Sequence, residues 1–322
     1  MKLKERPRRL RASQTIRDMV SETDLLPKHL GYPLFIAEGK GVDSRHAQVP
    51  GIRTLSVDKL APCLKEDVTS KGIPLVVLFG VTSKKDAKGS EALNADGAVV
   101  RAIKEIRNIA PDVVVATDIA LDPYTDHGHD GLFEKNKILN DATVEVLCQM
   151  SALHAKAGAQ MVAPSDMMDG RIQAIRKALD VDSAEEVAIL AYTAKYASAL
   201  YGPFRETLAA QVQGDKKTYQ MNPTNRREAL RELEIDVREG ADIVMVKPAS
   251  WYLDVIADFK AKAAVPVAAY QVSGECAMIE LGAKNGLFDR TRAMQESAVS
   301  IRRAGADLIV TYFAPELAAL SL

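Results

Sequence analysis

The sequence predicts an α/β protein folded as a (β/α)8 TIM barrel. Eight short runs rich in valine, isoleucine and leucine recur along the chain, separated by longer segments with helical apolar spacing. A continuous apolar run is typical of a parallel strand that is buried on both faces. Eight strand–helix units favour a barrel, and an open doubly wound sheet is the structural alternative. The runs expected to be strands span residues 33–38, 74–80, 112–120, 161–166, 188–195, 243–247, 266–272 and 308–314.

The segments between these runs carry helix signals. Residues 141–156 form a predicted helix with Asp141 as its N-cap, and residues 222–239 form another. Three predicted helices end at a glycine just before a strand, namely Gly158, Gly240 and Gly305. Glycine at that place adopts the left-handed conformation that ends a helix, so the repeated pattern supports alternating strands and helices.

Two segments do not fit the repeat. Residues 1–31 form a predicted N-terminal arm with a short helix, and residues 32–322 form the barrel. The arginine-rich stretch 6–11 is either a solvated tail or part of an arm that embraces a neighbouring subunit, since arginine suits ion pairing at interfaces. A long polar insertion at about 202–222 is expected to be a lid over the active site, because long loops in compact domains are often lids or disordered segments.

Composition narrows the class of protein. The 322 residues are 47% hydrophobic and 26% charged, with a formal net charge of −1, which is typical of a soluble globular protein and disfavours nucleic-acid binding. Cys63, Cys148 and Cys276 lie far apart, so neither a disulfide framework nor a thiolate zinc site is indicated. There is no apolar run of 18 residues and no secretory signal pattern, so we expect a cytoplasmic protein that does not contact membranes.

Reactive side chains occur where the predicted strands end, which is where barrel enzymes place their active sites. Two of them are lysines, Lys195 and Lys247, at the ends of consecutive strands. Burial disfavours an ammonium group, and two neighbouring ammonium groups repel each other, so a neutral amine becomes available to attack a ketone. The alternative is that each lysine only forms an ion pair with a carboxylate. The other strand-end candidates are Asp118, Ser165, Asp166, Ser273 and Tyr312.

The segment 117–131, after the third strand, is rich in aspartate and histidine. It contains four aspartates and two histidines, a composition too polar for a packed connector. Oxygen ligands favour magnesium, and histidine with carboxylate suits a transition metal. The alternative is a solvated aspartate-rich turn.

The predicted lid carries positive charge. Arg205, Lys216 and Lys217 lie in it, together with Tyr219 and Gln220. Cationic side chains on a closing loop suit the capture of a substrate carboxylate. The alternative is a solvated basic loop.

Nearly the whole chain resembles the porphobilinogen synthase (5-aminolevulinate dehydratase) family. Many long motifs in the same order carry this resemblance, which makes it far more specific than any single signature. The matching stretches are residues 6–11, 163–171, 194–198, 201–205, 219–223, 245–248, 270–275 and 303–307. The resemblance implies a (β/α)8 barrel with an N-terminal arm, assembled as a homo-octamer.

The resemblance implies an activity. Two molecules of 5-aminolevulinate are condensed through lysine Schiff bases into porphobilinogen with loss of two waters, a hydro-lyase reaction of tetrapyrrole (heme and chlorophyll) biosynthesis. Lys247 matches the lysine that binds the first, or P-side, substrate, and Lys195 matches the lysine that binds the second, or A-side, substrate. Lid closure would exclude the water that hydrolyses imines.

The resemblance also implies roles for the residues around the lysines. Asp118 and Ser165 match residues around the P-side amino group, and Ser273 and Tyr312 match the hydroxyls that hold the P-side carboxylate. The residues that match the A-side carboxylate site are Arg205, Lys216 and Gln220.

The chain departs from the zinc-dependent members of the family. Ala120, Asp122 and Asp130 stand where those members carry three cysteines, so no catalytic Zn2+ of the cysteine type is expected. This is the pattern of the aspartate or magnesium-type branch, and whether Asp122 and Asp130 bind a cation is left open. Lys216 stands where many members have arginine, which excludes a bidentate fork. Glu232 matches an allosteric Mg2+ ligand, and one carboxylate suffices because Mg2+ keeps most of its waters.

Two rival functions remain at the level of sequence. One is a class I aldolase-like barrel enzyme with a single Schiff-base lysine. The other is a non-catalytic barrel whose basic arm binds anionic partners. The second strand-end lysine and the two sets of carboxylate-holding residues argue against the first rival, and the reactive strand ends argue against the second.

Overall fold

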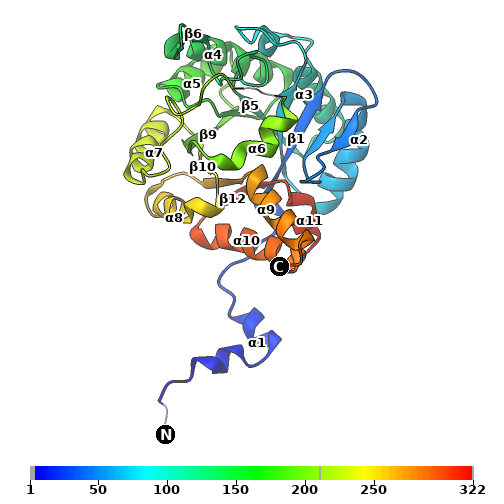
Figure 1. The fold of residues 1–322 in the computed structure, drawn as a ribbon, viewed down its shortest axis with the longest axis vertical. Helices are drawn as coiled ribbons and strands as arrows, with labels where there is room; N and C mark the ends of the chain where they lie inside the picture. The colour runs from blue at the N-terminus through cyan, green and yellow to red at the C-terminus, as the bar shows by residue number, and fades with distance from the viewer. Residues whose placement is uncertain (1–3, 210–211, 321–322) are drawn as a thin grey trace.

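Eight parallel strands close into a barrel in the computed structural model, which describes residues 4–209 and 212–320 (Figure 1). The last strand pairs with the first through Leu30 and Ile309, and this pairing closes the sheet. The predicted barrel is therefore confirmed, and the open sheet is excluded. The barrel strands are β1 (Leu30–Ala37), β4 (Leu75–Val81), β5 (Val114–Ile119), β8 (Met161–Pro164), β9 (Ala188–Lys195), β10 (Ile243–Lys247), β11 (Val267–Gln271) and β12 (Leu308–Thr311).

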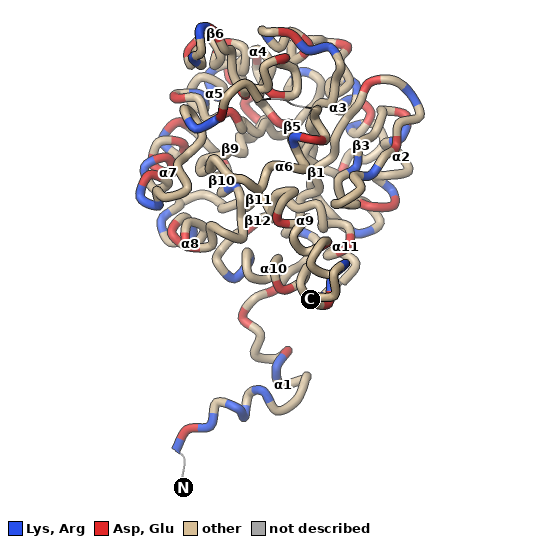
Figure 2. The backbone as a smooth tube through the Cα atoms, viewed as in Figure 1, with Lys and Arg blue, Asp and Glu red and all other residues tan. Residues whose placement is uncertain are grey.

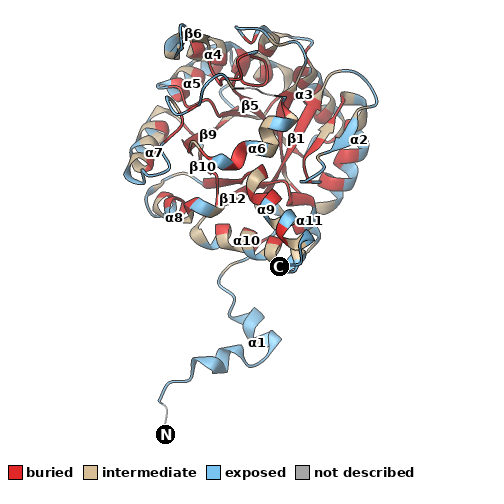
Figure 3. Ribbon diagram, viewed as in Figure 1, coloured by how far each residue is buried: buried red, intermediate tan, exposed pale blue. Residues whose placement is uncertain are grey.

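The longer helices surround the barrel, and each has buried residues. In α3 (Ala98–Ile109) the buried side chains recur at helical spacing, as in Val99, Ile103 and Ile106, so one apolar stripe packs on the strands. Figure 3 shows the buried strands inside and the exposed faces of the helices outside. The other longer helices are α4 (Asn140–Ala157), α5 (Arg171–Val181), α7 (Arg227–Glu239), α8 (Leu253–Lys262), α9 (Ser273–Lys284) and α10 (Arg290–Ala304). Shorter helices are α2 (Leu60–Cys63), α6 (Gly202–Thr207) and α11 (Ala314–Ala319).

The predicted glycine stops are confirmed. Gly158, Gly240 and Gly305 have φ angles of 108°, 107° and 121°, and each follows the last residue of a helix. A side chain is strained at such angles, which is the physical reason for glycine there.

Two predicted helix starts were wrong. Asp141 is not the N-cap of α4, because the helix begins one residue earlier, at Asn140. Asp141 lies in the first turn, where a negative charge suits the helix dipole. The helix expected from residue 222 begins at Arg227, because Asn222 forms a local turn in which its Oδ1 accepts a hydrogen bond from the Thr224 N–H at 3.0 Å.

Two small hairpins were not predicted. β2 (Asp43–Arg45) and β3 (Arg53–Leu55) pair with each other, and β3 also pairs with the end of β1. β6 (Phe133–Glu134) and β7 (Lys137–Ile138) form the second hairpin, which follows the aspartate-rich segment. Strands of two or three residues carry too few alternating positions to be recognised in a sequence.

The N-terminal segment projects away from the barrel (Figure 1). It contains a 3-10 turn (Pro7–Arg11) and α1 (Gln14–Met19), neither of which has a buried residue, and a further 3-10 turn (Pro27–His29) leads into β1. Lysine and arginine are frequent along it (Figure 2). The first strand begins at Leu30, so the last two residues assigned to the arm belong to the barrel, and residues 1–3 lie outside the described part of the chain.

Within residues 4–209 and 212–320, each helix is too short or too polar to cross a lipid bilayer. Cys63, Cys148 and Cys276 are all free thiols.

Candidate active site

The two strand-end lysines lie side by side at the mouth of the barrel. Lys195 is the last residue of β9 and Lys247 is the last residue of β10, and the two are direct partners in the register of these parallel strands. Both are 5% exposed and line the same cavity. The adjacency expected from sequence is therefore confirmed at the level of individual residues.

Lys247 is surrounded by aromatic rings. Its Nζ lies 4.5 Å from the ring centroid of Tyr270 and 5.0 Å from that of Tyr192, with Tyr201 and Phe204 slightly farther away. No carboxylate within the described ranges forms an ion pair with it. Burial lowers the pKa of Lys247 to about 7, and the positive charge of Lys195 adds to this effect. A substantial fraction of Lys247 is therefore a neutral amine near neutral pH, which is the nucleophilic form.

Lys195 has the opposite surroundings. Its Nζ lies 2.8 Å from Asp130 Oδ2 and also donates to the carbonyl oxygen of Ser165. Asp130 binds a second ammonium group, that of Lys216, which in turn lies 3.0 Å from Asp122 Oδ2. Burial alone would raise the pKa of Asp130, but the two ammonium groups hold it well below its usual range. The ion-pair alternative thus describes the resting contact of Lys195 but not that of Lys247.

Asp118, on β5, is a buried carboxyl group beside the lysines. Burial and the charge of Asp122 raise its pKa to about 7, and a hydrogen bond from Ser165 only partly offsets this. Its Oδ1 has no hydrogen-bond partner within the described part of the chain. A carboxyl group with a pKa near 7 exchanges protons readily at neutral pH, which suits general acid–base catalysis.

The two predicted carboxylate-binding hydroxyls lie next to the aromatic wall of Lys247. Ser273 begins α9, and its Oγ accepts a hydrogen bond from the Phe204 N–H at 3.0 Å. The hydroxyl of Tyr312 lies 3.0 Å from that of Tyr270. Both contacts are to residues that flank the lysine, so the two hydroxyls belong to the Lys247 side of the site.

Sequence reasoning missed the aromatic wall. Tyr192, on β9, and Tyr270, on β11, both turn their rings toward the Lys247 ammonium. Phe204 comes from the lid instead. Strict alternation would put Tyr192 and Lys195, three residues apart, on opposite faces of β9, and the register between β9 and β10 is irregular there. The sequence therefore indicated neither this ring nor the lid residue that joins it.

The lid covers the site. α6 crosses the mouth of the barrel (Figure 1), and the cavity beneath the lid measures only about 20 Å³. Such a space holds little more than a water molecule, so substrate entry requires the lid to move. The lid brings three predicted residues to this cavity, namely Arg205, Lys216 and Gln220. Ser165 and Asp122 also line it, and residues 210–211 of the predicted lid lie outside the described chain.

The two histidines of the aspartate-rich segment hold the lid. His129 donates from Nε2 to the carbonyl oxygen of Gln213 at 2.8 Å, and its Nδ1 lies 3.1 Å from the Tyr219 hydroxyl. The backbone carbonyl of His127 accepts a hydrogen bond from the Gln213 N–H at 3.0 Å. Burial lowers the pKa of both histidines. Within the described chain, no group of three or more His, Cys, Asp or Glu side chains is arranged to hold a metal ion.

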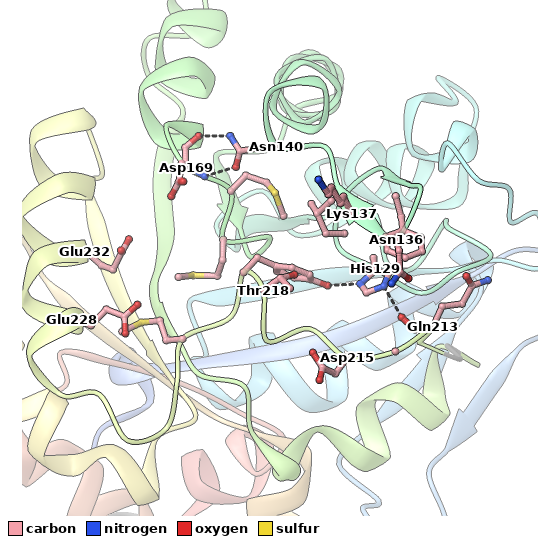
Figure 4. Close-up of a pocket in the computed structure, with 17 residues that line it drawn as sticks. His129, Asn136, Lys137, Asn140, Asp169, Gln213, Asp215, Thr218, Glu228 and Glu232 are labelled. Carbon is pink, nitrogen blue, oxygen red and sulfur yellow. Dashed lines mark hydrogen bonds between the residues drawn. The ribbon is translucent and has the colours of Figure 1, made fainter.

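Glu232 lies outside the barrel mouth, on α7. It faces a larger pocket of about 630 Å³, shared with Glu228 and Asp169 (Figure 4). Burial raises the pKa of Glu232 to about 6, although Arg171 opposes this. His129 and the lid residue that it holds, Gln213, form the opposite wall of the same pocket. The lid thus separates the Glu232 pocket from the lysine cavity.

A buried arginine connects α7 to the catalytic strands. Arg171 Nη2 donates to the carbonyl oxygen of Tyr192 at 3.2 Å and lies 3.4 Å from Asp236 Oδ2, and its Nε lies 3.7 Å from Asp166 Oδ2. Both carboxylates are fully or almost fully buried. The sequence had placed Asp166 at the strand end but had not indicated its partner.

The chain matches known proteins along almost its whole length. The family model described as delta-aminolevulinic acid dehydratase matches residues 4–320. The delta-aminolevulinic acid dehydratase of Halalkalibacterium halodurans is 47% identical over 315 residues, covering 98% of this chain and 96% of the relative. That of Synechococcus elongatus is 48% identical, covering 97% of each.

A solved structure agrees with these matches. The delta-aminolevulinic acid dehydratase (porphobilinogen synthase) of Toxoplasma gondii, in complex with the reaction product porphobilinogen, superimposes with a TM-score of 0.95 at 44% identity, covering 98% of this chain and 91% of that one. With matches of this extent and identity, the chain belongs to the delta-aminolevulinic acid dehydratase family.

Proposed function

We propose that this chain is a hydro-lyase that condenses two molecules of 5-aminolevulinate into porphobilinogen with the loss of two waters. Family membership and the product complex of the Toxoplasma gondii relative support this activity. The observation that carries it in this chain is the pair of buried lysines, Lys195 and Lys247, in direct register on adjacent strands. Two substrates require two anchoring points, and this pair provides them.

The chemistry is a double Schiff base. The amine of each lysine attacks the ketone of one substrate and forms an imine, and each imine releases one water. One imine tautomerises to an enamine, whose carbon attacks the imine carbon of the other substrate and forms the C–C bond. The amino group of one substrate attacks the remaining imine carbon and forms the C–N bond. Each bond formation is followed by release of a lysine amine, and loss of a ring proton completes the pyrrole.

The surrounding residues divide between the two substrates. Ser273 and Tyr312, beside the aromatic wall, would hold the P-side carboxylate at Lys247. Asp118, with its pKa near 7, would move protons near that substrate, and Ser165 would help to orient its amino group. On the Lys195 side, the A-side carboxylate would be held from the lid by Arg205, Lys216 and Gln220.

Of the two places where the sequence suggested a cation, the Glu232 pocket fits Mg2+ and the Asp122–Asp130 pair does not. Glu232 faces the large outer pocket, and one carboxylate suffices for a hard cation that keeps most of its waters, so we propose an allosteric Mg2+ there. When bound, Mg2+ would supply a positive charge and ordered waters in the pocket between α7 and the lid. Asp122 and Asp130 do not fit a cation site as they stand, because both carboxylates bind the Lys216 ammonium. With aspartates in place of thiolates, we assign the chain to the aspartate or magnesium-type branch.

We further propose a cytoplasmic homo-octamer. The arm has no buried residue in its 3-10 turn (Pro7–Arg11) or in α1. The side chains of Leu10 and Met19 on it are 56% and 75% exposed. An arm with exposed apolar side chains and several arginines suits packing against a neighbouring subunit. Three free cysteines fit a reducing compartment.

A product assay tests the proposed function. The protein, incubated with 5-aminolevulinate alone, should form a pyrrole that reacts with an aldehyde reagent, and Lys247→Ala should abolish it. A class I aldolase-like enzyme would cleave or condense other carbonyl substrates through one lysine and would form no pyrrole. Near-normal pyrrole formation by Lys247→Ala would show that the lysine assignment is wrong.

A further inference from the structure

A lid lysine lies between two aspartates in the active site. The Lys216 Nζ is 3.0 Å from Asp122 Oδ2 and also in contact with Asp130 Oδ1. All three side chains are buried, and Asp130 is fully so. Lys216 therefore makes a desolvated contact with two carboxylates, which is a different situation from a lysine on a solvated loop.

The charges around this contact balance. Lys195 and Lys216 face Asp122 and Asp130, which gives two ammonium groups and two carboxylates. A divalent cation added between the aspartates would leave this buried cluster with a net charge of about +2, at a high electrostatic cost in a desolvated site. A cation could bind there only if Lys216 left.

We infer that the Lys216 ammonium takes the place of a divalent cation between Asp122 and Asp130, and that closure of the lid delivers it. The identity of the site as catalytic rests on the proposed function, but the occupancy of the aspartate pair does not. A lysine suits this position because its ammonium is a compact point charge with three donors. Two donors serve the aspartates, and the third remains for the carboxylate of the A-side substrate.

The consequence is that the lid and the charge of the site are coupled. With the lid open, two carboxylates share one ammonium group, that of Lys195, and the cluster carries excess negative charge. With the lid closed, Lys216 neutralises the pair and fixes Asp130, which in turn positions Lys195 at 2.8 Å. In this sense Lys216 is a positioning residue for Lys195 as well as a contact for substrate.

Manganese binding without substrate tests this inference and does not depend on turnover. Mn2+ is counted per chain by electron paramagnetic resonance in proteins that all carry Glu232→Gln, which removes the proposed α7 ligand. Lys216→Met should gain one Mn2+ per chain relative to this background, and adding Asp122→Asn should abolish the gain. Lys217→Met is the matched control and should gain none, since Lys217 is an exposed lid lysine whose one ion pair among the described residues is with Asp215 at 3.6 Å.

Two outcomes would overturn the inference. One is a Mn2+ ion bound by the Glu232→Gln protein itself that Asp122→Asn removes, because the aspartates would then bind a cation in the presence of Lys216. The other is a folded Lys216→Met protein, with an unchanged circular dichroism spectrum, that gains no Mn2+. If Lys216→Met does not fold, Lys216→Gln, which keeps hydrogen-bond donors without the charge, replaces it. Failure of pyrrole formation would instead count against the proposed function.

Discussion

At the scale of single residues, the two lysines differ because of their neighbours. Lys247 lies among aromatic rings with no carboxylate partner in the described chain, whereas Lys195 is bound to Asp130. A neutral amine attacks a ketone, and an ion-paired ammonium must first lose its proton. Lys247 is therefore expected to form the first imine, and Lys195 the second.

The pH dependence of the first imine follows from this difference. Since burial lowers the pKa of Lys247 to about 7, the amine is mostly neutral above pH 7 and mostly protonated below it. The rate of the first imine should fall about tenfold for each pH unit well below 7. Stopped-flow measurement of imine formation in single turnovers from pH 5.5 to 10 tests this. A rate that continues to rise steeply up to pH 10 would show that Lys247 has the pKa of an ordinary lysine.

At the scale of elements, the three lid residues assigned to a substrate carboxylate, Arg205, Lys216 and Gln220, all serve the A-side substrate. Arg205→Ala should raise the 5-aminolevulinate concentration that half-saturates the second site more than the one that half-saturates the first. The reason is that Ser273 and Tyr312, not Arg205, are assigned to the carboxylate of the first substrate. Loss of a charge-assisted contact costs about 1.5–3 kcal/mol. Product formation measured over a wide range of 5-aminolevulinate concentrations separates the two half-saturation points. If both half-saturation concentrations rose by the same factor, the division of residues between the two substrates would be wrong.

His129 should also control the lid. His129→Phe keeps a ring beside Phe133, whose centroid is 4.6 Å away, but loses the hydrogen bonds to Gln213 and Tyr219. Each such bond contributes about 0.5–1.5 kcal/mol, so the lid should open at least several times more often. Hydrogen exchange of the amides in 212–220 should speed up, while that of α8 serves as an internal control. Unchanged exchange in the lid would exclude this role.

The barrel strands could be predicted from the sequence, but the long-range side-chain contacts around the site could not. The eight strands could be predicted because a strand buried on both faces must be continuously apolar, and β9 and β10 have the predicted bounds. The lysine pair followed from the strand order. The ion pairs of Asp130 with Lys195 and of Arg171 with Asp236 could not be predicted, because each joins residues 65 positions apart whose relative register only the folded chain defines.

At the scale of the whole molecule, the lid lies between two pockets. The lysine cavity, lined by the lid residues Lys216 and Gln220, is on one side, and the Glu232 pocket, lined by the lid residues Gln213 and Tyr219, is on the other. A cation or a neighbouring subunit at the outer pocket can therefore alter the lid without contacting substrate. Such coupling requires that the outer ligand bind more tightly to one lid state than to the other.

Magnesium titration tests this arrangement. Glu232→Ala should reduce the ratio of activity with Mg2+ to activity without it toward one, because the proposed ligand is lost. Glu234→Ala, an exposed glutamate on the same helix, should keep the wild-type ratio. Size-exclusion chromatography with and without Mg2+ should show whether the ion also changes the assembly. Full stimulation of Glu232→Ala would place the ion elsewhere.

Reduction of the enzyme–substrate mixture with borohydride tests the central claim most directly. Borohydride converts an imine into a stable amine, so peptide mass spectrometry identifies each lysine that had bound substrate. At limiting 5-aminolevulinate the label should appear on Lys247, and at high concentration it should appear on Lys195 as well. A label confined to one lysine at every concentration, or one found on a third lysine, would contradict the double Schiff base.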